Sequence, residues 1–206
     1  MARQLIYYPD PVLRVPAKKV SKVTVNVRGL ILDMIEVMAA NNGMGLAASQ
    51  VGVPLQVFVA DVGEGPFAVI NPKVAMATGE QIGLEGCLSF PRLYGDVARA
   101  KAVTVRGLDS QGKKISIEAE DLLARVLQHE IDHLKGALFT DKVDPATVHW
   151  LLGYDAETGE PIKQPAILQD ALRVLERAAG RAAERPLTAG PSRKAAPIGS
   201  GRVSPS

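Results

Sequence analysis

Two histidines flank a carboxylate in the stretch QHEIDH at residues 128–133. In an α-helix, His129 and His133 would project from one face, where both imidazoles can bind the same metal ion. Glu130 would lie beside them and could handle the proton of a water that the metal activates. The chain has only three histidines, so a chance pair at this spacing is a poor explanation. The pattern therefore predicts a hydrolytic metal site.

A third ligand has to come from elsewhere in the chain, because a catalytic site of this type takes three protein ligands and leaves one position open. Cys87 is the candidate, as the only cysteine of the chain. Gly86 before it would let the backbone turn the thiolate inward, and a thiol beside a cationic metal loses its proton readily. Taken alone, Cys87 would more often be a small buried hydrophobic residue. Beside the histidine pair it is predicted to bind the metal.

The segment GMGLAASQ at residues 43–50 is rich in small residues, which allow the backbone to approach another group closely. Many tight loops share this composition, so the informative residue is Gln50. Its carboxamide could point an N–H at the oxygen of a tetrahedral intermediate. The alternative is that Gln50 only ties down the loop, and the spacing does not decide between the two.

The spacing of apolar residues predicts two helices around these motifs. The first follows possible caps at Ser21 and Thr24, runs from about residue 27 to 38, and stops at Asn41–Gly43. The second carries the QHEIDH motif, with Gly136 placed as its C-terminal cap. Its predicted buried stripe consists of Leu122, Leu123, Val126, Leu127 and Leu134.

Short strand-like runs lie between the two helices. They are QVFVAD near residue 58, FAVINPKV near 70, VTVRGL near 105 and KISIEA near 117, with a hairpin turn at 109–112. Strands that run together before a helix, instead of alternating with helices, are typical of an α+β fold. We expect mainly antiparallel strands packed around a central helix that carries the HExxH motif.

The composition limits the class of protein. A chain of 206 residues that is 47% hydrophobic can form one domain with a sizeable core and additional length. A formal charge of +2 is too small to indicate a direct role on DNA. The first apolar stretch is interrupted by Arg28, Asp33 and Glu36, so neither a signal peptide nor a membrane partner is expected. One cysteine favours a reducing compartment, and we expect the cytoplasm.

Three parts are expected along the chain: a catalytic domain over residues 1–165, a helix over 166–180, and a basic tail without fixed structure over 181–206. From residue 171 to the end there are six arginines and one lysine against Glu176 and Glu184. The tail is interpreted as solvated, and the alternative is an element that docks on ribosomal RNA. The stretch after Asp144 has no interpretation, and His149 and Trp150 within it are expected to be packing residues.

Together, GMGLAASQ at 43–50, EGCLS at 85–89 and QHEIDH at 128–133 resemble, in the same order, the three signature blocks of the peptide deformylases. An opening of similar style, YYPDPVLRVPAKKV, precedes them. The resemblance implies removal of the formyl group from N-formylmethionine on nascent polypeptides, with release of formate. It also implies one divalent metal ion per chain, ferrous iron in the cell, while Zn²⁺, Ni²⁺ and Co²⁺ also suit such ligands.

The resemblance also implies roles for single residues. Cys87, His129 and His133 would be the metal ligands, and Glu130 would act as general acid and base. Gln50 and the backbone N–H of Leu88 would donate hydrogen bonds to the developing oxyanion.

Further positions follow from these roles. The apolar slot for the methionine side chain is expected to be lined by Met44, Leu46, Leu88 and Val126, and Gly45 is expected to bind the substrate as well. Arg92 is a candidate for gripping the substrate backbone, and the stem of Arg125, four residues before His129, for a wall of the slot. Behind the ligands we expect Glu85, Asp132 and Arg99, since ligand imidazoles need acceptors and neighbouring carboxylates need a cation.

Two other functions compete with this interpretation. A zinc-dependent endopeptidase shares the helix motif, but one such class continues with HxxGxxH, where this chain has Phe139 in place of the last histidine. Another takes a downstream glutamate, and Glu157 lies in a predicted turn. The second alternative is a non-catalytic module that docks at the ribosome. In such a module a closed metal site would only stabilise the fold. Glu130 argues against it, because a structural site needs no base.

Overall fold

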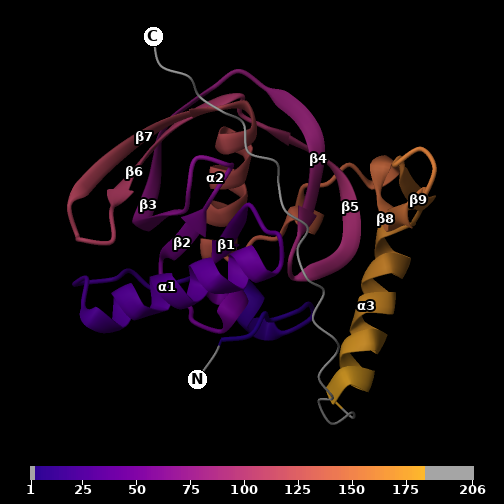
Figure 1. Cartoon of the computed structure of the whole chain (residues 1–206), viewed down its shortest axis with the longest axis horizontal. Coiled ribbons are helices and arrows are strands. Elements are labelled where there is room, and N and C mark those ends of the chain that lie inside the picture. Colours follow the sequence, from indigo (N-terminus) through magenta and orange to yellow (C-terminus); the bar gives the residue numbers. More distant parts are fainter. Residues whose placement is uncertain (1–2, 184–206) are drawn as a thin grey trace.

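The computed structural model describes residues 3–183 and has an α+β fold (Figure 1). Within this range lie the α-helices α1 (Val25–Ala40), α2 (Asp121–Leu134) and α3 (Leu168–Ala183). Short 3-10 helices cover Pro11–Arg14, Ala48–Val51, Phe139–Asp141 and Pro145–Thr147. No helix in the described range combines the length and apolarity that crossing a membrane requires.

The strands form two sheets in which every named pair is antiparallel. The five-stranded sheet has the order β1-β2-β3-β6-β7. Its strands are β1 (Gly45–Ala47), β2 (Val57–Ala60), β3 (Phe67–Thr78), β6 (Ala102–Leu108) and β7 (Lys114–Glu120). The four-stranded sheet has the order β4-β5-β8-β9. Its strands are β4 (Gln81–Cys87), β5 (Phe90–Arg99), β8 (His149–Tyr154) and β9 (Pro161–Pro165).

The first helix forms where the apolar spacing predicts it. Thr24 is its N-cap and accepts a hydrogen bond from the backbone N–H of Val27, so of the two possible caps it is Thr24 and not Ser21 that begins the helix. The helix ends at Asn41. Its buried face consists of Val27, Leu30, Ile31, Met34 and Met38 and packs against β1 and β2.

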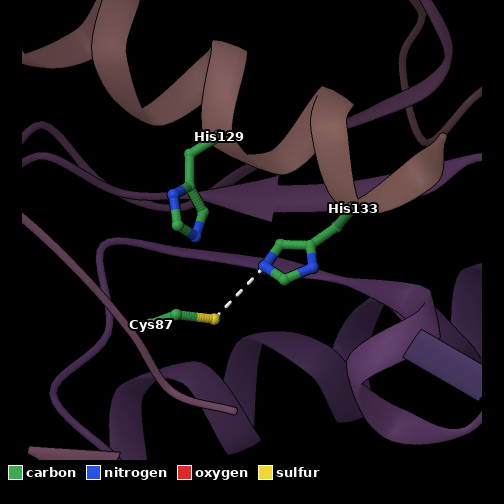
Figure 2. Close-up of side chains that lie close together, drawn as sticks. All are labelled: Cys87, His129 and His133. Atoms are coloured by element: carbon green, nitrogen blue, oxygen red, sulfur yellow. Dashed lines mark hydrogen bonds between the residues drawn. The ribbon is translucent and has the colours of Figure 1, made fainter. Parts of the chain in front are cut away.

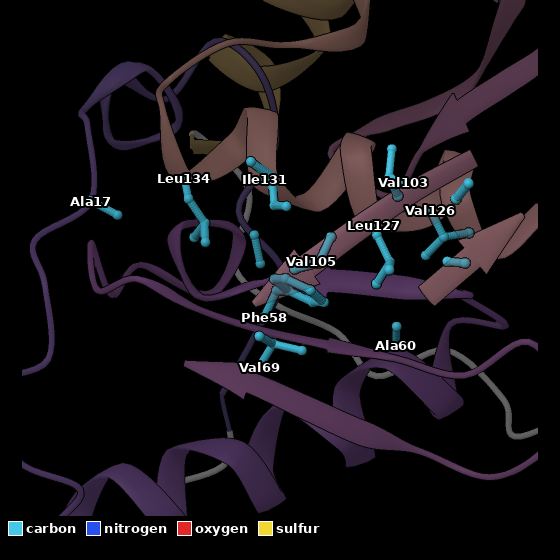
Figure 3. Close-up of a cluster of buried hydrophobic side chains, with 13 residues drawn as sticks. Ala17, Phe58, Ala60, Val69, Val103, Val105, Val126, Leu127, Ile131 and Leu134 are labelled. Carbon is cyan, nitrogen blue, oxygen red and sulfur yellow. The ribbon is translucent and has the colours of Figure 1, made fainter. Parts of the chain in front are cut away.

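The motif helix α2 lies over the five-stranded sheet, and its buried side chains meet those of the strands (Figure 3). Val126, Leu127 and Leu134 belong to this core as predicted. Leu122 does not, because it is 47% exposed at the start of the helix. Gly136 follows the helix with φ +74°, and a Cβ there would lie 2.4 Å from the backbone oxygen of Arg14. The predicted glycine stop is therefore required by both conformation and space.

The four-stranded sheet was not predicted from the sequence. Its first two strands contain Gly83, Gly86 and Gly95 together with buried charged residues, a composition that is depleted in strands. The hairpin of β8 and β9 occupies the stretch that had no interpretation. His149 is buried and stacks on Tyr94, while Trp150 packs against the third core cluster, so both are packing residues as expected.

Helix α3 packs against the domain that precedes it. Ala171 is buried among Leu13, Phe90 and Phe139, and Glu176 accepts a hydrogen bond of 2.8 Å from the hydroxyl of Tyr8. The helix continues to Ala183, so residues 181–183, predicted to belong to the tail, are helical. The rest of the predicted tail lies outside the described residues.

Candidate metal centre

Cys87, His129 and His133 converge although they are far apart in the sequence (Figure 2). Cys87 ends β4, and the two histidines lie one turn apart on α2. The Sγ atom of Cys87 is 3.2 Å from Nε2 of His133, and the ligand atoms of all three lie within 4.8 Å of one another. Among residues 3–183, this is the one group of cysteine, histidine and acidic side chains close enough together to hold a metal ion.

The chemistry of the cluster fits a divalent transition metal. A thiolate and two imidazoles are ligands that such ions prefer, and three protein ligands leave a position for solvent. Burial lowers the pKa of His133 well below its usual value, which favours the neutral ring. The pKa of His129 is raised instead, because burial is outweighed by its hydrogen bonds with Cys87 and Glu85, so metal binding at His129 has to displace a proton. The neutral imidazole is the form that binds a metal ion.

Glu130 lies beside the ligands on α2 and is buried. Burial raises the pKa of Glu130 to about 7, although the charge of His129 acts in the opposite direction. Its Oε2 atom has no hydrogen-bond partner among the described residues. A Cβ at Gly45 would lie 2.3 Å from the Oε1 atom, so only glycine lets β1 pass this close to the carboxylate. A buried carboxyl group with a pKa near neutrality can both accept and donate a proton.

Gln50 is buried next to the cluster, in the 3-10 helix after β1. Its Oε1 atom accepts a hydrogen bond of 2.8 Å from the backbone N–H of Ala47. Its Nε2 atom lies 3.2 Å from Oγ of Ser89 and 3.4 Å from Sγ of Cys87. The side chain thus ties down its own loop, and its amide nitrogen lies at the edge of the cluster. The oxyanion role of Gln50 stays a prediction.

Glu85, Arg99 and Asp132 lie together behind the ligands. Arg99 donates two hydrogen bonds of 2.8 Å to Glu85 and a third to Asp132, and Glu85 Oε2 is 2.9 Å from Nδ1 of His129. Burial alone would raise the pKa of Glu85, but the hydrogen bonds with Arg99 and His129 outweigh it and lower the pKa below its usual range. Glu85 therefore stays ionised and can orient the ring of His129.

A cleft of about 350 Å³ opens beside Cys87, His129 and Glu130. Of the residues predicted at the substrate, Met44, Gly45, Leu88, Val126 and Arg92 line it. Leu46 does not: it is fully buried in the core around α1, so its assignment to the slot was wrong. The sequence analysis also missed wall residues from the N-terminal segment, β4, β5 and α2, among them Leu5, Tyr7, Leu84, Pro91, Tyr94 and Leu122. No local pattern marks these residues as cleft-lining.

Comparison with known proteins identifies the family of this chain. Residues 2–149 match the family described as Polypeptide deformylase. The peptide deformylase of Carboxydothermus hydrogenoformans is 50% identical over 135 residues, which cover 66% of this chain and 89% of that protein.

Two solved structures are also similar. The peptide deformylase from Thermotoga maritima has a TM-score of 0.69 and 42% identity, over 70% of this chain and 99% of that chain. The one from Legionella pneumophila has a TM-score of 0.74 and 36% identity, over 90% of this chain and 100% of that chain. The chain therefore belongs to the polypeptide deformylase family, the metal-dependent hydrolases that remove the N-formyl group from nascent peptides.

Proposed function

We propose that Cys87, His129 and His133 hold one divalent metal ion and that Glu130, Gln50 and Leu88 perform deformylation beside it. The convergence of one sulfur and two ring nitrogens within 4.8 Å is the observation that carries this proposal. When bound, such an ion lowers the pKa of water and polarises a carbonyl group. Release of formate from formyl-Met-Ala by the metal-loaded protein tests the proposal.

Each residue of the site has a defined task in this proposal. Glu130 takes the proton of the attacking water and returns it to the leaving amine, which its pKa of about 7 and its unpaired Oε2 atom support. Gln50 and the backbone N–H of Leu88 donate hydrogen bonds to the formyl oxygen as that oxygen becomes negative. The products are formate and a free N-terminus.

The metal ion is proposed to be Fe²⁺. The thiolate and imidazole ligands suit iron, zinc, nickel and cobalt alike, and the resemblance of the motifs favours iron. Elemental analysis of protein purified without oxygen, combined with the formate assay, identifies the ion that supports activity.

The substrate is proposed to be the nascent N-formylmethionyl polypeptide. Met44, Leu88 and Val126 line the cleft beside the metal centre and offer an apolar slot for the methionine side chain. Arg92 is exposed at the same cleft. Its backbone has φ +65°, a conformation that is uncommon outside glycine. We propose that its side chain binds the backbone of the substrate.

The wider setting is also a proposal. We propose that the catalytic unit covers residues 1–165 with α3 packed on it, and that the protein works in the cytoplasm. Arg173 and Arg177 are exposed on α3 and would support docking of the basic C-terminal region on the ribosome. Such docking would weaken as salt rises, which cosedimentation with ribosomes measures.

The two competing functions have less support. Phe139, at the position of a third protease histidine, packs in the core, and Glu157 lies in the exposed turn between β8 and β9. A purely structural metal site would not require a buried base such as Glu130 at the edge of an open cleft.

Replacing Gln50 with leucine is expected to lower kcat about 10²- to 10³-fold, because one oxyanion donor is lost. Metal content should stay at the wild-type level, since Gln50 is not a ligand. Ser89→Ala is the matched control, because it removes a partner of the Gln50 amide and leaves the donor in place. Equal activity of Gln50→Leu and wild type would remove Gln50 from the mechanism.

Replacing Arg99 with alanine is expected to weaken metal binding about 10- to 100-fold, because Glu85 would no longer orient His129 firmly. The change also removes the cation that two buried carboxylates share, but Glu85 keeps Arg125 and Asp132 keeps Lys142, so folding stability should fall by less than the about 3–5 kcal/mol of an uncompensated buried charge. Metal content after dialysis and thermal unfolding measure the two effects. Arg106→Ala, on the exposed side of β6, should change neither. Unchanged metal retention in Arg99→Ala would contradict the assigned role.

A further inference from the structure

Arg125 is buried on the motif helix, one turn before His129, with only 7% of its surface exposed. Burying an arginine is costly unless its guanidinium is paired and hydrogen-bonded. The catalytic steps above leave this residue without a task beyond lining the cleft. Its polar contacts point to a different role.

The guanidinium of Arg125 connects α2 to both neighbouring strands of the other sheet. Nη1 donates hydrogen bonds of 2.8 Å to Oε1 of Glu85, on β4, and to the backbone oxygen of Val97, on β5. Nη2 donates to the backbone oxygen of Gln81, on β4, at 3.3 Å. One side chain therefore ties the helix that carries both histidines to the strand that carries Cys87.

Gly83 provides the space for this connection. A Cβ at Gly83 would lie 3.1 Å from Nη2 of Arg125 and 3.4 Å from its Cζ atom. The contact with Nη2 is tighter than most Cβ contacts, so a side chain at this position would require the guanidinium to shift by a few tenths of an ångström. The glycine that weakens the strand pattern in the sequence thus lets the helix and the strand approach each other.

Glu85 is bound by two arginines, Arg99 at the end of β5 and Arg125 on α2. Its Oε1 atom accepts from Nε of Arg99 and Nη1 of Arg125, both at 2.8 Å. Its Oε2 atom accepts from Nη2 of Arg99 at 2.8 Å and lies 2.9 Å from Nδ1 of His129. With both oxygens bonded in this way, the carboxylate has one orientation available, and the Nε2 atom of His129 is left for the metal.

We propose that Arg125 is a positioning residue of the metal centre: it sets the spacing between the histidine helix and the cysteine strand and fixes the orientation of Glu85. This inference rests on the proposed function of the Cys87, His129 and His133 cluster. The planar guanidinium suits the task, because it bonds three acceptors on two strands at once, which a single ammonium group does not do in fixed geometry.

The test compares Co²⁺ binding by wild type and Arg125→Met, with a chelator as competitor and the absorption band of thiolate-bound Co²⁺ as the signal. Methionine keeps an apolar stem along the cleft wall and removes every donor. Residues that orient ligands typically change metal affinity about 10- to 100-fold, and we expect a fall of this size with a shifted cobalt band. Arg106→Met controls for the loss of an arginine.

Val105→Ala controls for loss of stability, because it removes buried methyl groups from the core of the five-stranded sheet. Wild-type affinity in Arg125→Met, or an equal fall in Val105→Ala, would overturn the inference. Should Arg125→Met fail to fold, Arg125→Lys applies the same test, since it keeps the charge and loses the planar fork of donors, and wild-type affinity there would also overturn the inference. Absence of the cobalt band in the wild type would instead overturn the proposed metal centre itself.

Discussion

Glu130→Gln is expected to release formate from formyl-Met-Ala about 10²- to 10⁴-fold more slowly than wild type, or slower still, while it keeps its metal ion. Glutamine has nearly the same shape but does not accept a proton at neutral pH. The glutamine side chain has little room to move to another position, because the carboxylate that it replaces is buried and Gly45 lies directly against it.

The control for this variant is Glu118→Gln, an exposed glutamate on β7, which should retain full activity. Metal content measured on the same samples separates loss of the base from loss of the ion. Full activity of metal-loaded Glu130→Gln would show that another group moves the proton.

His133→Ala is expected to lose the metal ion and with it the activity. Removing a ligand should weaken binding by more than the about 10- to 100-fold typical of residues that only orient ligands. The chain offers a matched control in His149, which is also buried but stacks on Tyr94 and bonds to the backbone oxygen of Thr147. His149→Ala should therefore keep its metal.

Metal content per chain after gel filtration measures the effect, and thermal unfolding without metal shows whether both variants fold. Stoichiometric tightly held metal in His133→Ala, or equal loss in both variants, would argue against His133 as a ligand.

The parts of the site that could be predicted from the sequence are those set by local geometry. A spacing of four residues places His129 and His133 on one helix face whatever the surroundings, and the single cysteine left one candidate for a soft third ligand. Glu85, Arg99 and Asp132 were predicted on chemical need, because imidazoles and carboxylates require partners. The structure places all three together behind the ligands.

The errors arise where orientation depends on tertiary packing. Successive residues of a strand face opposite sides, so Gly45 faces Glu130 while Leu46 enters the core around α1. Leu122 fits the apolar stripe of the motif helix but lies at the cleft, where the helix begins and the sheet no longer covers it.

Strands β4 and β5 were missed because their glycines and charged residues resemble a loop. Their buried charges become favourable only when Arg99 and Arg125 meet Glu85 across the fold. Those contacts join residues up to 40 positions apart in the chain, a distance that local periodicity does not encode.

X-ray absorption at the zinc edge, on the Zn²⁺-loaded protein, tests the central claim most directly. We predict one sulfur at about 2.3 Å and two imidazole nitrogens at about 2.0–2.1 Å from the ion, with a solvent oxygen as the remaining ligand. A spectrum without sulfur, or one with a fourth protein ligand in place of solvent, would contradict the assignment of Cys87, His129 and His133 as an open catalytic metal centre.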